Sequence, residues 1–131
     1  MKEKYLYFRT EATDANDDAT GDSACFPASS LMGMQPTADT ALTLYFKPMV
    51  RRDPTGSADA TAGLDNHDAV ILTISANTHA TAMKAIANAI HGDNFPAFLV
   101  IANDDSDGTE YLAGSGVTAC GTISVSAAYA N

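Results

Sequence analysis

Only one stretch of this sequence has the periodicity of an amphipathic helix, and this restricts the fold more than any other feature. The stretch THATAMKAIANAIHG places Met83, Ile86 and Ile90 on one face of a helix at about residues 78–91. Gly92 would take a left-handed conformation after its end. The other apolar segments are short and bounded by glycine, proline or aspartate, as strands are. The chain is therefore expected to be mostly β with one helix.

Strand signals lie on both sides of the predicted helix. They are found in YLYFRT, ALTLYFKPMV, DAVILTIS, AFLVIAND and EYLAGSGVTACGTISVSAAY. ACFPASSLMGM predicts an edge or bent strand, because Pro27 has no amide hydrogen for a ladder, and QPTADT predicts a turn. Gly114, Gly116 and Gly121 indicate bends or bulges. The predicted class is α+β, mostly β: a small, strongly bent antiparallel sheet or a partly open barrel with one helix.

The length and composition describe one domain over residues 1–131, with two long polar loops at about residues 11–23 and 51–67. The N-terminal stretch MKEKYLYFRT has no apolar run of signal-peptide length, and no segment has the length of a membrane span. We expect a chain made in the cytoplasm, with no membrane partner. Cys25 and Cys120 stand far apart and are expected to be buried thiols.

The charge balance argues against nucleic acid as a partner. Sixteen acidic residues face seven basic ones, for a formal net charge of −9. Affinity for nucleic acid comes largely from lysine and arginine at the phosphates, and here those residues are scattered.

The stretch NDDSDGTEYLAG has the spacing of the first half of a calcium-binding loop. Asn103, Asp105 and Asp107 stand at alternate positions and Gly108 follows, but Gly114 occupies the place of the bidentate glutamate. Strand-like segments flank the stretch where helices would be required. A hairpin loop is the preferred interpretation, and a calcium-binding module stays as the third alternative for function.

No familiar catalytic or cofactor motif occurs in the chain. There is no GxSxG elbow, no phosphate-binding glycine motif and no metal-ligand spacing of histidines or cysteines. We predict a protein that is not an enzyme and has no cofactor.

The most distinctive segment is CFPASSLMGMQPTADTALTLYF, which crowds methionines around a glycine. Core packing is one role for these residues, and an adaptable interface to a second subunit is the other. The candidate interface residues are Phe26, Leu31, Met32, Met34, Val117 and Val125, and strand addition at sheet edges is the expected mode of contact.

The chain as a whole resembles a family of small uncharacterised proteins of marine bacteriophages, cyanophages especially, and of marine metagenomes. The resemblance lies in YLYFR, ACFPASSLMGM, ALTLYF, DAVILTI, HATAMKAIANAI, FLVIANDD and VTACGTISVSAA. It implies the shape of an Sm-like or SH3-like small barrel, ring-type assembly, and an accessory or virion-associated structural role. The chain departs from RNA-binding Sm-like rings in having aspartate and glycine in its loops where those rings have basic and stacking residues.

These observations favour a non-enzymatic, oligomeric structural or accessory protein of phage origin. Its expected partners are copies of itself and other virion proteins, and its place is the host cytoplasm or the virion. The alternative is an Sm-like nucleic-acid-binding ring, with Arg51 and Arg52 near the axis and Tyr45 available for stacking.

Overall fold

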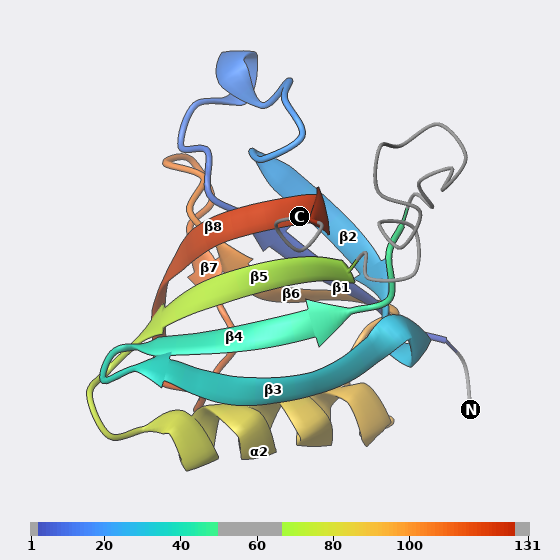
Figure 1. Cartoon of the computed structure of the whole chain (residues 1–131), viewed down its shortest axis with the longest axis vertical. Coiled ribbons are helices and arrows are strands. Elements are labelled where there is room, and N and C mark those ends of the chain that lie inside the picture. The colour runs from blue at the N-terminus through green and yellow to red at the C-terminus, as the bar shows by residue number, and fades with distance from the viewer. Residues whose placement is uncertain (1–2, 50–66, 128–131) are drawn as a thin grey trace, which may run out of the picture.

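The structure is a computed structural model that describes residues 3–49 and 67–127. In these parts of the chain two four-stranded sheets enclose the core, and a single α-helix runs alongside β3 at one side of them (Figure 1). The strands are β1 (Tyr5–Arg9), β2 (Ser23–Pro27), β3 (Leu31–Ala38), β4 (Ala41–Phe46), β5 (His67–Ile74), β6 (Phe98–Asn103), β7 (Glu110–Tyr111) and β8 (Val117–Ala127). The helix is α2 (His79–His91), and two short 3-10 helices are η1 (Asp14–Asn16) and η2 (Ala28–Ser30).

The two sheets differ in how their strands are connected. Sheet A has the order β2-β1-β6-β7 and sheet B the order β3-β4-β5-β8. Sheet B is antiparallel throughout, whereas β1 and β6 in sheet A run parallel. The mostly β class with one helix is confirmed. The predicted single antiparallel sheet differs from the structure, because β1 pairs with β6 across about ninety residues of intervening chain instead of pairing only with a sequence neighbour.

Side chains alternate between the inner and the outer face along the strands, and the inward ones form the core. Leu42, Leu44 and Phe46 of β4 are buried on one face, as their period-two spacing predicts. The rings of Phe26 and Phe46 stack with centroids 4.2 Å apart and join sheet A to sheet B. The core therefore lies between the two sheets.

The helix covers one side of this core, between β3 of sheet B and β6 of sheet A. Ala82, Ile86 and Ala89 are its buried residues. Lys4, just before β1, is buried and its Nζ donates to the carbonyl oxygens of Ala89 and Gly92, which the last turn leaves free. Helix α2 is thus held to the start of sheet A by a side chain that caps its C-terminus.

Two local predictions are corrected by the structure. Gly92 is extended (φ −82°, ψ 135°) and not left-handed; a Cβ there would lie 2.8 Å from the carbonyl oxygen of Asn88, so close packing accounts for the glycine. The predicted turn QPTADT is shorter than expected. β3 continues to Ala38, with Pro36 on an edge strand where its missing amide hydrogen is tolerated.

Candidate functional site

The densest group of charged side chains lies at the end of sheet A where β1 and β6 finish. Arg9, the last residue of β1, is buried and its guanidinium contacts Asp14 at 2.8 Å, Asp105 at 3.5 Å and Asp17 at 3.7 Å. Its Nε also donates to the carbonyl oxygen of Glu11. The carboxylates, Asp14 first, raise the pKa of Arg9 above its usual value. The arginine therefore holds loops 10–22 and 104–109 together by charge.

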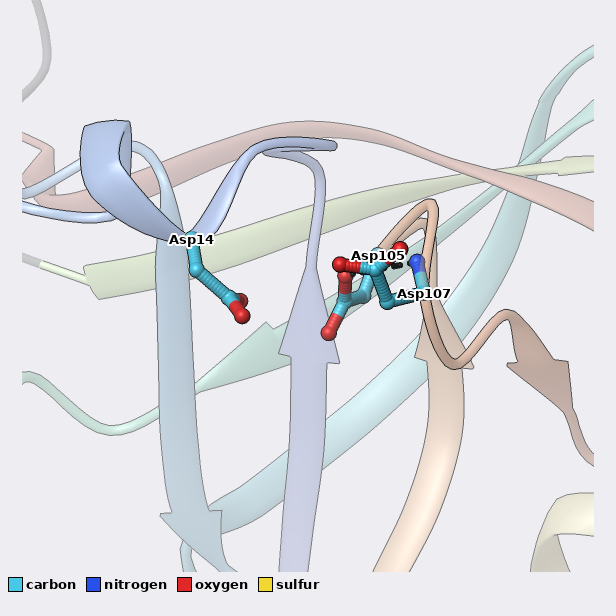
Figure 2. A group of neighbouring side chains, drawn as sticks. All are labelled: Asp14, Asp105 and Asp107. Atoms are coloured by element: carbon cyan, nitrogen blue, oxygen red, sulfur yellow. Dashed lines mark hydrogen bonds between the residues drawn. The ribbon is translucent and has the colours of Figure 1, made fainter.

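The same place contains the carboxylates closest to a metal-binding arrangement. Oxygens of Asp14, Asp105 and Asp107 lie within 4.8 Å of one another, and Figure 2 shows the side chains of Asp14 and Asp105 directed toward the space between the two loops. Arg9 contacts two of the three carboxylates and already supplies positive charge there. Because a cation would have to compete with a bound guanidinium, the arrangement fits an ion-paired loop junction better than a metal centre.

The stretch with the spacing of a calcium loop is a hairpin loop in the structure, as the preferred interpretation of the sequence expected. Strands β6 and β7 pair on either side of it, and its turn is closed by a hydrogen bond from the Gly108 amide to the Asp105 carbonyl. The side chains of Asn103 and Asp105 accept hydrogen bonds from the amides of Asp105 and Asp107 respectively. Asn103 is thus occupied in a local turn, and the acidic group is completed by Asp14, which precedes Asp105 by 91 residues and was not among the predicted ligands.

Asp104 joins the two sheets, a role that the sequence did not indicate. It lies just after β6 and is half-buried. Its carboxylate accepts hydrogen bonds from the Cys120 amide of sheet B, at 3.1 and 3.2 Å, and from the Tyr111 hydroxyl of sheet A. Burial, with the nearby Asp104 charge, raises the pKa of Cys120 and of Tyr111 to about 12. The Cys120 thiol and the Tyr111 hydroxyl are therefore protonated and unreactive at neutral pH.

Two of the predicted interface residues belong to the core. Phe26 is 1% exposed and Val117 is 7% exposed, and both lie in the main hydrophobic cluster. Phe26 is buried because its ring enters the aromatic cluster between the sheets, and Val117 because it faces inward opposite Ile74. Neither side chain is available to a second subunit in this fold.

The other predicted interface residues divide into two kinds. Leu31, Met34 and Val125 are half-buried and pack against the core. Met32 is 55% exposed, and it lies beside a bulge in β3 on the outer side of sheet B. Of the six candidates, Met32 is the one that presents most of its side chain to the surface.

The predicted nucleic-acid residues are not brought together by the described parts of the chain. Tyr45 is half-buried on the outer face of sheet B, where its ring lies 5.9 Å from that of His67. Arg51 and Arg52 lie outside the described residues.

An exposed group of aromatic side chains on sheet A was missed by the sequence reasoning. Tyr5 is 46% exposed and Phe98 is 53% exposed, and they are opposite each other on β1 and β6. The ring of Tyr7 lies 5.0 Å from that of Phe98. The alternation in YLYFR places Tyr5 and Tyr7 on one face, but their proximity to Phe98 depends on the parallel pairing, which the sequence does not reveal.

Comparison of the chain with protein-family models, with curated proteins and with solved structures gives no match. Within residues 3–49 and 67–127, no helix combines the length and the apolar character needed to cross a membrane.

Proposed function

We propose that this chain is a non-enzymatic structural or accessory protein that acts through self-association. The observation that carries the proposal is the distribution of charge over the described residues. Five acidic residues in segment 11–22 and four in segment 104–110 make nine of the sixteen in the chain. These two segments lie together, since Ser106 donates to the Ala12 carbonyl from both its amide and its hydroxyl. The acidic residues are thus concentrated at one end of sheet A, as Figure 1 shows for the loops before β2 and after β6.

The outer faces of both sheets are left without charged side chains along most of their strands. On sheet B the outward positions of β4 pair with those of β5 as Ala41 with Thr73, Thr43 with Ile71 and Tyr45 with Ala69, and His67 follows at the start of β5. On sheet A they are the aromatic residues of β1 and β6 and their neighbours on β2. Two copies of a chain with a net charge of −9 repel each other, and that repulsion is smallest where the facing surfaces are neutral and apolar.

The resemblance to small marine-phage proteins supports a virion-associated or assembly-related role, in a host cell or in the particle. An Sm-like partly open barrel remains part of the proposal, supported by the bulged strands β3 and β8 and by the single helix in the described chain. The parallel β1–β6 pair and the division into two sheets weigh against the Sm-like arrangement.

The test is light scattering on the peak from a sizing column, with absorbance at 260 and 280 nm recorded across it. A discrete oligomer free of nucleic acid is the expected result. A monomer at every concentration from micromolar to millimolar would refute self-association, and an oligomer that carries nucleic acid would favour the ring with Arg51 and Arg52 instead.

A further inference from the structure

The outer face of sheet A carries two exposed aromatic side chains opposite each other, Tyr5 and Phe98. We call it the aromatic face, and it consists of Tyr5, Tyr7, Cys25, Pro27, Phe98 and Val100. Tyr5 and Phe98 are about half exposed, and none of the six residues is charged. Exposed contiguous apolar surface of this kind marks a place that another surface covers.

The net charge of the chain limits which kind of partner could bind the aromatic face. A polyanion such as single-stranded nucleic acid would be repelled by the net charge of −9, and the basic residue at the end of this face, Arg9, is buried and already paired with Asp14, Asp17 and Asp105. A basic protein would be drawn to the acidic loops at the end of the sheet and not to its neutral face. A second copy of the chain presents the same neutral aromatic surface, and a two-fold axis pairs such a surface with itself.

Three of the four sheet edges, those of β8, β3 and β7, are less suitable for association than the faces. The outer edge of β8 is covered at its middle: the Cys120 amide donates to Asp104, the Cys120 carbonyl accepts from the Thr10 hydroxyl, and Gly21 lies over the Ile123 carbonyl. The edge strand β3 has two bulges and contains Pro36. Strand β7 has two residues. Bulges, proline and covering loops are the features that prevent strand addition.

We propose that the aromatic face of sheet A is the surface on which two copies of this chain pair, face to face, with their strands antiparallel across the interface. The inference rests on the proposed self-association and names its surface. The orientation follows from charge, because the cluster of Arg9, Asp14, Asp105 and Asp107 lies at only one end of the face. Parallel stacking would bring the two acidic clusters opposite each other across the spacing of about 10 Å between packed sheets. Antiparallel stacking separates them by the length of the strands as well, which exceeds the screening length of about 8 Å.

The size of the face sets the expected strength. Strands β1 and β2 have five residues each and β6 has six. At about 3.3 Å per residue and about 4.8 Å between strands, the three-stranded face is smaller than the roughly 800 Å² per partner of a standard stable interface. The pairing is therefore expected to be reversible and visible as a concentration-dependent dimer.

The experiment compares Phe98→Asp with Ile71→Asp by sedimentation velocity over a concentration series. Ile71 lies on the outer face of sheet B and is 36% exposed, so the same charge is added to the other neutral face. The dimer dissociation constant should rise roughly a hundredfold or more for Phe98→Asp, because two-fold symmetry removes the aromatic side chain twice and each removal costs about tenfold. Ile71→Asp should dimerise as the unaltered chain does. A thermal melt of each variant establishes that it is folded, and Phe98→Ser replaces Phe98→Asp where the aspartate prevents folding.

The outcomes separate this inference from the proposed function. If the unaltered chain dimerises and folded Phe98→Asp dimerises equally well, the aromatic face is not the interface, while self-association stands. If the unaltered chain is a monomer throughout the series, both statements fail. If its peak carries nucleic acid that Phe98→Asp loses, the face binds nucleic acid and the inference is overturned.

Discussion

Replacing Phe26 with alanine tests whether this side chain belongs to the core or to an interface between subunits. Its ring stacks on Phe46 at 4.2 Å and lies 6.0 Å from Phe8, so it bridges β2 of sheet A to β4 of sheet B. All three rings are buried, at 0–1% exposure. A residue placed in this way contributes to folding whether or not the chain is oligomeric.

The magnitude follows from the packing. Truncating a buried phenylalanine to alanine costs about 3–5 kcal/mol, and loss of favourable ring–ring geometry accounts for about 0.5–1.5 kcal/mol per pair. A domain of this size has a total stability of about 5–15 kcal/mol, so Phe26→Ala should remove a large part of it. Phe26→Leu keeps most of the buried volume and is the matched control, with an expected loss of about 1–2 kcal/mol.

The assay is urea denaturation at two protein concentrations, with the monomer–dimer balance recorded on the same samples. Core packing predicts that Phe26→Ala shifts the midpoint strongly at both concentrations. A stability loss below about 1 kcal/mol, together with a weaker dimer, would contradict the core assignment and restore Phe26 as an interface residue.

Three further predictions concern the loop junction, the sheet B packing and the tyrosine that faces Asp104. Arg9→Gln should lower the melting temperature because it leaves mutually repelling carboxylates, and the loss should be smaller in high salt; calcium should leave the melting temperature of the unaltered chain unchanged. Gly121→Ala should be destabilising, because its Cβ would lie 2.6 Å from the Ile71 carbonyl oxygen, whereas Gly33→Ala, with no atom within 4 Å, should be tolerated. Burial and the hydrogen bond to Asp104 raise the pKa of Tyr111 to about 12, above the value of about 10 in an unfolded chain, so stability should fall as the pH rises from about 10 through 12. Tyr111→Phe should make that alkaline fall shallower, and an unchanged slope in pH-dependent melts would contradict the assignment.

The helix, the strand β4 and the hairpin could be predicted from the sequence because each depends on a pattern of neighbouring residues. The helix expected at about residues 78–91 is α2, His79–His91, and the inward alternation of β4 follows its period-two pattern. The hairpin interpretation of residues 103–111 is confirmed by the pairing of β6 with β7. In each case the residues that determine the structure are close to each other in the sequence.

The arrangement of the sheets was not accessible, because it depends on pairings between distant segments. Nothing in YLYFR or AFLVIAND specifies that Tyr5 lies opposite Phe98 in a parallel pair. The burial of Phe26 has the same origin, since it requires sheet A to close over sheet B. An apolar residue beside a proline is compatible with core and interface alike until the partner strand is known, and this is why the sequence-based interface set mixed the two.

Most of the acidic residues lie in the loops at one end of sheet A, and the outer faces of the sheets are therefore largely uncharged. The stretch that resembled a calcium site gathers carboxylates, but its partner is Arg9 from the end of β1, and so the loops are fixed beside the sheet instead of around a metal ion. Because nine of the sixteen acidic residues lie in the two loop segments at that end, the strands of sheet A expose Tyr5 and Phe98, with Tyr7 half-buried between them, on a face with little charge. A charge placed among these three residues should therefore disturb association more than folding, whereas a charge removed from Arg9 should disturb folding more than association. The opposite pattern would show that the loop cluster, and not the aromatic face, is the part of the molecule that a partner contacts.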